Sequence, residues 1–320
     1  MFQENRLSLL TFLLCLWSNQ ILYNNFVRYG IKSLQYLKMK INLQKLLFLG
    51  LMPITLSGHA QVRLDDWETG YPTYTSLSKA DQEQPESVVK VSLFGEKIES
   101  WERICKYKKI RGLELIDMFR DQFPACICGL HELQYLSVRN NKLVTLPGEF
   151  TDLNKLEFLD LYWNENLIEL PQDFEKLSNL QSINIGGNPK LNWNKVFLAL
   201  AKLPKLKTVR MSFNRIQSLP PEIGLLTQLE ELIIDNNLLT DLPIQMSAMK
   251  NLKRIVLTNN KFSSISKVIS ALPAIQQIDI ANTYEEDMDK SLTGSYGHNK
   301  ISEAEIKALK KSKPSVSITF

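Results

Sequence analysis

The recurrence of one short pattern of aliphatic residues and asparagine constrains this chain more than any other feature of its sequence. Each copy has the order L-x-x-L-x-L-x-x-N, in which L stands for an aliphatic residue or methionine. Six complete copies begin at Leu133, Leu156, Leu180, Leu206, Leu229 and Leu252. A seventh begins at Ile275 and has Thr283 at the asparagine position, and successive copies start 23, 24, 26, 23, 23 and 23 residues apart. Repetition at this period predicts a stack of similar units, each packed on its neighbours.

The alternation within each copy predicts a short β-strand. The fourth and sixth positions have the same parity, so their side chains point to one face of the strand. We expect this face to build a continuous core, because a single repeat cannot bury its own apolar residues and neighbouring repeats must cover them. The strands are then parallel and lie side by side in the order of the sequence.

Several copies end in Leu-Pro, as at Leu146-Pro147 and Leu242-Pro243. With the spacing, this tail resembles the leucine-rich-repeat family, in its short 23-residue type, over residues 88–283. Two less regular units precede the seven copies, which makes about nine units. The resemblance implies an α/β fold, a curved, horseshoe-shaped solenoid with a parallel concave β-sheet, capped at both ends. It also implies a structural ladder of buried amides that bind backbone groups of the turns, formed by Asn141, Asn164, Asn188, Asn214, Asn237 and Asn260.

The N-terminal sequence predicts export. Residues 39–60 combine a positively charged start, an apolar stretch and small residues before a cleavage site that follows Ala60. This is the pattern of a signal peptide. The apolar stretch is shorter than the roughly 20 residues that span a membrane. Residues 1–38 would then be a doubtful upstream extension, with translation starting at Met39. We expect the exported chain in the periplasm, at the cell surface or in the medium, without a transmembrane anchor, and its features resemble exported bacterial members of the family.

The ends of a solenoid need caps, because they would otherwise expose the core. Residues 61–87 are the N-terminal candidate, with a short helix predicted over 76–84. Residues 284–320 are expected to form a linker and a C-terminal cap. There, Ser302 and Glu305 have the spacing of a capping box, which predicts a helix, and an alternating apolar pattern in the last five residues predicts a final strand.

Three cysteines follow the predicted signal peptide: Cys105, Cys126 and Cys128. Cys105 is five residues before Ile110, and Cys128 is five residues before Leu133, so the two occupy the same position in adjacent repeats. An exported chain can keep a disulfide. We therefore expect a Cys105–Cys128 bridge with Cys126 free, and the alternative is three buried or reduced thiols.

No arrangement of residues in the sequence supports catalysis. Neither His131 nor His298 has a second histidine or a cysteine at metal-ligand spacing, and no nucleotide-binding loop or nucleophile elbow is present. Gly186-Gly187 directly precedes Asn188, so we interpret this pair as a feature of the repeat. We expect no enzyme activity, no cofactor and no metal ion.

Strand residues of the opposite parity are expected to line the concave face, and the eighth position, at its rim, adds Trp163 and Phe213. The aromatic ones are the most informative, because tyrosine and tryptophan are enriched in binding hot spots and clustered apolar surface usually marks an interface. The alternative is that Phe158 or Trp163 only packs on a neighbour. Ile233 and Val256 would extend an apolar strip. The candidate partner-binding residues are Tyr135, Phe158, Tyr162, Trp163, Arg210, Phe213, Ile233 and Val256.

Charges on the predicted concave face have both signs, and the net charge of the chain is only +4. No basic stripe could follow a phosphate backbone, so we expect no nucleic acid partner. Leucine-rich-repeat proteins commonly bind polypeptides, and the resemblance implies a protein or peptide partner. A glycan stacked on the aromatic residues is the rival interpretation. A structural role in the cell envelope, without a discrete ligand, is a third.

Overall fold

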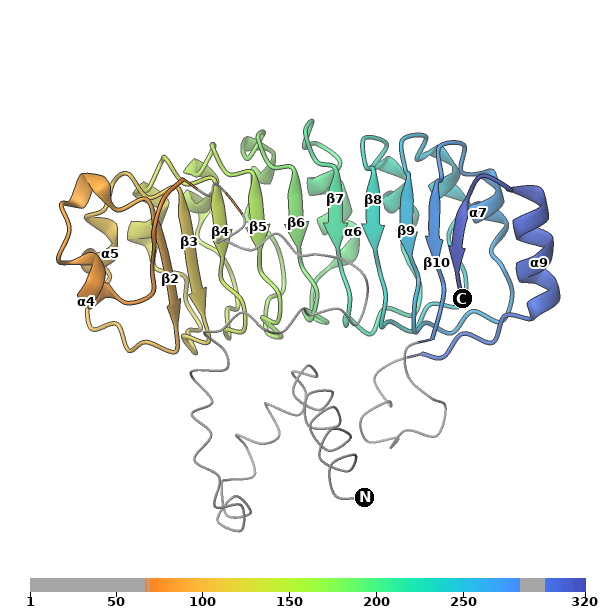
Figure 1. Cartoon of the computed structure of the whole chain (residues 1–320), viewed down its shortest axis with the longest axis horizontal. Helices are drawn as coiled ribbons and strands as arrows, with labels where there is room; N and C mark the ends of the chain where they lie inside the picture. Colours follow the sequence, from red (N-terminus) through yellow and green to blue (C-terminus); the bar gives the residue numbers. More distant parts are fainter. Residues whose placement is uncertain (1–66, 68–69, 283–296) are drawn as a thin grey trace, which may run out of the picture. The chain divides into compact units, whose positions relative to one another are not determined.

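One parallel β-sheet, with helical turns behind it, contains every strand of the residues described by the computed structural model, which are 67, 70–282 and 297–320. Its eleven strands follow one another in the order of the sequence, so each repeat pairs with the repeats before and after it (Figure 1). The predicted signal peptide (39–60) and upstream extension (1–38) lie outside the described residues. The predicted repeat solenoid with a parallel sheet is confirmed.

The strands are short, and their register aligns equivalent positions of successive repeats. Leu232, for example, pairs with Val209 on one side and with Ile255 on the other. The first strand was not predicted, because it precedes every recognisable repeat. The strands are β1 (Thr73–Tyr74), β2 (Lys90–Phe94), β3 (Gly112–Ile116), β4 (Tyr135–Ser137), β5 (Phe158–Asp160), β6 (Ser182–Asn184), β7 (Thr208–Arg210), β8 (Glu231–Ile233), β9 (Arg254–Val256), β10 (Gln277–Asp279) and β11 (Ser317–Thr319).

The chain returns from one strand to the next through a short helix. Where the repeat ends in Leu-Pro, the proline commonly caps or begins a 3-10 helix, since its fixed φ suits that position. Among the described residues, no helix is long and apolar enough to cross a membrane. The α-helices are α4 (Leu77–Ala80), α5 (Glu102–Cys105), α6 (Trp193–Leu200), α7 (Lys267–Ala271) and α9 (Glu303–Ser312). The 3-10 helices are η2 (Pro85–Ser87), η3 (Ala125–Gly129), η4 (Gly148–Asp152), η5 (Phe174–Lys176), η6 (Pro221–Leu225) and η7 (Ile244–Ala248).

The longest spacing in the repeat series has a structural explanation. Leu180 and Leu206 start 26 residues apart, and the repeat between them contains α6, an eight-residue α-helix, in place of a 3-10 turn. Asn192 caps this helix, because its side chain accepts the backbone N–H of Lys195 at 3.2 Å. The extra residues thus lengthen the outer side of the solenoid and leave the sheet register unchanged.

The core runs the length of the sheet between the strands and the helical turns. Residues at the fourth and sixth positions are buried in every repeat, and Leu232 and Ile234 have no exposed surface. Burial of one such side chain contributes about 1.5–3 kcal/mol. Repeats therefore stabilise one another by covering each other's aliphatic residues.

Buried asparagine amides connect the repeats where the chain leaves each strand. The amide nitrogen of Asn237 donates to the carbonyl of Met211 in the preceding repeat at 3.0 Å, and its oxygen accepts the N–H of Asn214 at 3.0 Å. Asn164 and Asn260 make equivalent contacts. Each amide thus satisfies backbone groups that the turn would otherwise leave buried without partners.

The seventh repeat takes its ladder amide from Asn299. The nitrogen of this side chain donates to the carbonyls of Leu257 and Ile280, each at 3.0 Å, and its oxygen accepts the N–H of Phe262 at 3.1 Å. Its own N–H donates to the side chain of Asn282 at 2.9 Å. Asn299 therefore occupies the ladder position of the seventh repeat, 24 residues after Ile275, whereas the other copies have their asparagine eight residues after the first position.

Both ends of the solenoid carry helices. The N-terminal helix is shorter than predicted, because α4 ends at Ala80 and Pro85 begins a separate 3-10 turn instead of ending a helix. At the C-terminus, Ser302 and Glu305 form the predicted capping box at the start of α9. The final strand, β11, pairs in parallel with β10.

The predicted Cys105–Cys128 disulfide is wrong. Cys105, at the end of α5, is bonded to Cys126, with the two Cα atoms 6.0 Å apart, and Cys128 is a buried free thiol. Cys126 and Cys128 lie on η3, where each residue turns by about 120°. Two residues apart, they point in different directions, so Cys128 enters the core while Cys126 faces the preceding repeat. Equal position in the repeat did not determine which sulfur could reach Cys105.

Candidate functional site

The strand face is the sheet surface opposite the core, formed by side chains at the third, fifth and seventh positions of each repeat. The parallel register places equivalent positions side by side. Tyr135 pairs with Phe158, and Arg210 pairs with Ile233. Adjacent strands are about 4.8 Å apart, so side chains of neighbouring repeats on this face lie within contact distance of one another.

Three of the candidate residues form one aromatic cluster beyond the C-terminal ends of β5 and β7. The ring centroids of Tyr162 and Trp163 are 5.4 Å apart, and that of Phe213 is 6.4 Å from Tyr162 and 5.9 Å from Trp163. The ring planes are tilted by 54–78° to one another. All three side chains are partly exposed. Tyr162, Trp163 and Phe213 are called the aromatic cluster below.

The two glycines of the intervening repeat make room for this cluster. A Cβ atom on Gly186 would be 2.9 Å from Cδ2 of Tyr162, and one on Gly187 would be 2.8 Å from Cε3 of Trp163. Any side chain here would push Tyr162 and Trp163 away from Phe213, which lies one repeat further on. The sequence analysis interpreted the glycine pair only as a feature of the repeat, because the contacts that need glycine come from another repeat.

The cluster also contains two residues with a strained backbone. The eighth position of the repeat has a left-handed conformation, with φ of 60° at both Trp163 and Phe213. A side chain with a Cβ atom pays roughly 1–2 kcal/mol for this conformation, which glycine, asparagine and aspartate tolerate best. Strained residues concentrate at functional sites. Six other repeats have small residues with positive φ at this position, namely Gly95, Asp117, Asn140, Gly187, Asn236 and Asn259.

Tyr135 is separate from the aromatic cluster. It was expected to be exposed, but it is buried. Only 4% of its surface is accessible, and the ring of Trp67 packs on it with centroids 5.8 Å apart. The carbonyl of Trp67 accepts a hydrogen bond from Lys90 Nζ at 3.3 Å. Burial raises the pKa of Tyr135 far above its usual range. Phe158 is partly exposed, with its ring 6.4 Å from that of Tyr135.

Ile233 and Val256 do not form the exposed apolar strip that was expected. Their exposed fractions are 3% and 0%. In the register of the sheet Arg210 pairs with Ile233, and Glu231 and Arg254 lie two residues before Ile233 and Val256 on the same face of their strands. These charged residues have longer side chains whose aliphatic parts can cover apolar neighbours. The two residues therefore belong to the buried layer under the charged side chains.

Charged side chains on the strand face are paired across repeats. Arg139 Nε is 3.4 Å from a carboxylate oxygen of Asp160, and its guanidinium lies 5.3 Å from the ring centre of Tyr162. Arg210 and Arg254 both approach Glu231, at 3.5 and 3.0 Å. The aromatic cluster thus has charged groups on both sides along the sheet.

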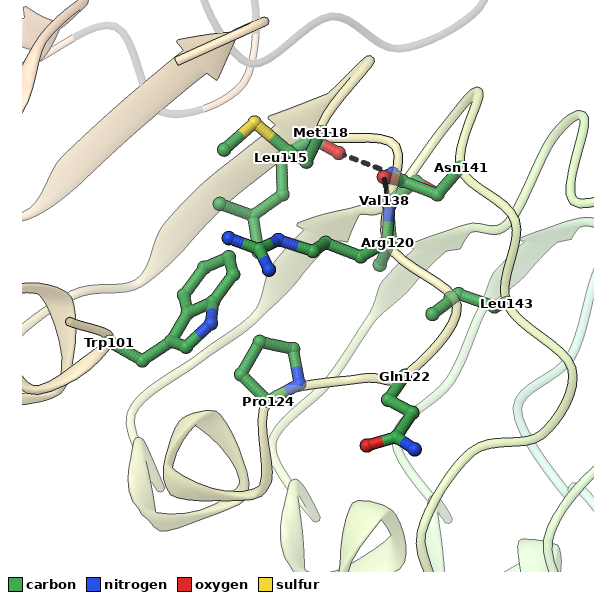
Figure 2. A pocket seen from close by; sticks show the side chains of 9 residues that line it. All are labelled: Trp101, Leu115, Met118, Arg120, Gln122, Pro124, Val138, Asn141 and Leu143. Atoms are coloured by element: carbon green, nitrogen blue, oxygen red, sulfur yellow. Dashed lines mark hydrogen bonds between the residues drawn. The ribbon is translucent and has the colours of Figure 1, made fainter. Parts of the chain in front are cut away.

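The described part of the chain contains no group of three or more histidine, cysteine, aspartate or glutamate residues that could hold a metal ion. Figure 2 shows a small indentation near the first repeats, where the Arg120 guanidinium lies 5.6 Å from the centre of the Trp101 ring. Its cavity volume is about 10 Å³, which is about the room of one water molecule and far below the roughly 300 Å³ at which small-molecule sites begin. The strand face is therefore the stronger candidate.

Two family models match the chain. One, described as Leucine rich repeat, matches residues 123–165 and 227–284. The other, described as Leucine Rich repeats (2 copies), matches residues 204–245. All of these segments lie within the solenoid.

The chain is also similar to segments of known proteins. It is 33% identical over 130 residues to an adenylate cyclase of Schizosaccharomyces pombe, a match that covers 38% of this chain but only 7% of that protein. Among solved structures, an internalin C2 of Listeria monocytogenes has a TM-score of 0.50 and 20% identity, with 62% of this chain and 88% of that chain covered. A plant peptide hormone receptor has a TM-score of 0.47 and 23% identity, with 66% and 34% covered. These structural likenesses concern the fold alone.

Proposed function

Because this chain is a leucine-rich-repeat protein, we propose that it is an exported binding protein that holds a polypeptide partner on its strand face. The observation that carries the proposal is the aromatic cluster. Three partly exposed rings come together only because Gly186 and Gly187 leave space and because Trp163 and Phe213 adopt a left-handed backbone. A purely structural repeat would be more stable with asparagine or glycine at these positions, so the strain indicates a selected surface.

The geometry of the rings favours a polypeptide over a glycan. A sugar stacks on the open face of an aromatic ring, whereas these planes are tilted by 54–78° to one another, and Tyr162 and Phe213 meet in an edge arrangement. Such an irregular apolar surface suits an aliphatic, proline or aromatic side chain of a partner. Hot spots of this residue composition contribute about 2 kcal/mol or more per residue on truncation.

The cysteine chemistry supports export. The bond between Cys105 and Cys126 is of a kind that persists in oxidising compartments and is rare in the cytosol. With the predicted signal peptide at 39–60, it favours a location outside the cytoplasm.

An affinity capture experiment tests the function. The purified protein is used as bait for envelope and medium fractions, next to a variant with Tyr162→Ala, Trp163→Ala and Phe213→Ala. We expect a protein that binds the wild type and is lost with the variant. If both baits capture the same proteins, the strand face is not the binding site. If capture is abolished by added free sugars, the partner chemistry is a glycan.

A matched control separates the loss of the site from the loss of apolar surface. Leu198, Leu225 and Ile244 are 48, 51 and 63% exposed on α6, η6 and η7, behind the sheet. A triple alanine variant of these residues removes three exposed apolar side chains as well, and it should capture the partner like the wild type. Far-UV circular dichroism of all baits checks that the repeats remain folded.

A further inference from the structure

Arg210, Glu231 and Arg254 form a group of charged side chains on three neighbouring strands, β7, β8 and β9. One carboxylate oxygen of Glu231 is 3.5 Å from Arg210 Nη2, and the other is 3.0 Å from Arg254 Nη1. Two guanidinium groups therefore share a single carboxylate. One positive charge of the group has no counterion within it.

This excess charge is partly removed from water. The side chains of Arg210 and Arg254 are only 17 and 20% exposed, and they lie beside the buried Ile233 and Val256. Burial lowers the pKa of Arg210 despite the nearby Glu231. The buried Nε of Arg254 meets no hydrogen-bond acceptor among the described residues. This Nε is itself beyond the reach of a ligand. The side chains keep 17 and 20% of their surface exposed, so an acceptor can reach the rest of each guanidinium and gains more there than in open solvent.

The other carboxylates near this group are engaged elsewhere. Asp160 is paired with Arg139 and accepts the backbone N–H of Tyr162 at 2.9 Å. Asp235 accepts hydrogen bonds from the hydroxyl of Ser212 and the amide of Asn236. Both carboxylates still attract Arg210 at longer range. A second carboxylate in direct contact with the arginine pair would come from a bound molecule.

We propose that Arg210 and Arg254 form a carboxylate-binding subsite for the polypeptide held by the aromatic cluster. This inference rests on the proposed function. Arginine suits the task, because its planar guanidinium binds both oxygens of a carboxylate. The source is an acidic side chain or the C-terminal carboxylate of the partner segment.

The spacing along the sheet defines the partner further. Phe213 follows Arg210 by three residues in the same repeat, and the chain turns there with a left-handed Phe213. An extended chain rises about 3.3 Å per residue, so the two positions are at most roughly 10 Å apart. An extended partner segment would match this distance with its carboxylate within about three residues of its apolar anchor residue.

Selection from two libraries of random twelve-residue peptides tests the subsite on the purified protein. One library is fused through its C-terminus, so that only side chains offer carboxylates. The other is fused through its N-terminus and has a free C-terminal carboxylate. We expect selected peptides to carry an aspartate or glutamate near an apolar residue in the first library, or an apolar residue near a free C-terminus in the second.

Paired substitutions in protein and peptide then isolate the charge contact. Binding should fall about tenfold or more with Arg254→Gln or with an acid-to-amide change in the peptide, and the two changes together should cost little more than either alone. Lys253→Gln is the matched control, because it removes the same charge one residue away, where exposed Lys253 pairs with Glu230 at 2.7 Å.

The outcomes separate this proposal from the proposed function. Peptides that require the aromatic cluster but show no acidic preference overturn the carboxylate subsite alone. So does an Arg254→Gln variant that weakens the acid and amide peptides equally, since that loss would be structural. If selected peptides bind the triple variant of the aromatic cluster as well as the wild type, or if no peptide is selected, the proposed function fails with it.

Discussion

Replacement of Asn299 by alanine should destabilise the C-terminal end of the solenoid as strongly as the loss of an ordinary ladder asparagine. The Asn299 amide is buried and makes three hydrogen bonds to backbone groups of Leu257, Ile280 and Phe262. Asn299→Ala would leave the N–H of Phe262 without an acceptor and would take a donor from two carbonyls. One buried unsatisfied group costs about 1–3 kcal/mol, and the N–H with at least one carbonyl should therefore cost about 2–4 kcal/mol.

Urea unfolding followed by far-UV circular dichroism measures this cost. For an m-value of about 3 kcal/mol/M, the midpoint should fall by about 1 M. The end repeats of a solenoid can unfold apart from the rest, so an early partial transition in the variant would count as the same loss.

The control is Asn251→Ala, since Asn251 is exposed and its amide donates to the carbonyl of Thr227 at 2.8 Å on the surface. This variant should lose less than about 0.5 kcal/mol. If Asn299→Ala changed the unfolding midpoint no more than Asn251→Ala does, the assignment of Asn299 to the ladder position of the seventh repeat would be refuted.

Three further changes test other parts of the structure. Gly187→Ala should lower the free energy of unfolding by about 2–3 kcal/mol and alter the tryptophan fluorescence spectrum, because the residue is left-handed and its new Cβ would be 2.8 Å from Trp163; an unchanged melt and spectrum would contradict the packing. Cys126→Ser should abolish the disulfide and cost about 3 kcal/mol for bonded residues 21 apart, whereas Cys128→Ser should keep it, and intact mass before and after reduction and thiol blocking distinguishes the two. Burial raises the pKa of Asp117 from 3.8 to about 6, so the folded protein retains a proton that the unfolded chain releases. The free energy of unfolding should then fall by on the order of 1–3 kcal/mol as the pH rises from about 4 to 6, with no further loss above; Asp117→Asn should remove this slope, and parallel stability profiles of variant and wild type would argue against it.

The repeat architecture could be predicted because its information is local. Leu232 and Ile234 lie on the core side by the parity of their positions, and the buried asparagines follow at a constant distance. Ser302 and Glu305 form a capping box by their spacing alone. Each of these features depends on contacts within a few residues or on the identity of equivalent positions, both of which the sequence displays directly.

Contacts between repeats were harder to predict from the sequence. The tertiary structure decided that Cys126, and not Cys128, reaches Cys105, because the direction of each side chain depends on the local 3-10 turn. It also placed Asn299 in the ladder, although its distance from Asn260 departs from the repeat period. The spacing of residues in the sequence does not show that Asn299, rather than a residue at the usual distance, occupies the ladder position.

The candidate site shows the same division. Sequence parity put Tyr162 on the strand face, and the eighth position of the repeat put Trp163 and Phe213 at its rim. Only the structure showed that Gly186 and Gly187 let the three rings meet, and that the predicted strip at Ile233 and Val256 is buried. Parity determines the side of a strand to which a residue points. Its exposure depends on the lengths and directions of side chains from other repeats, which become neighbours only when the sheet has formed.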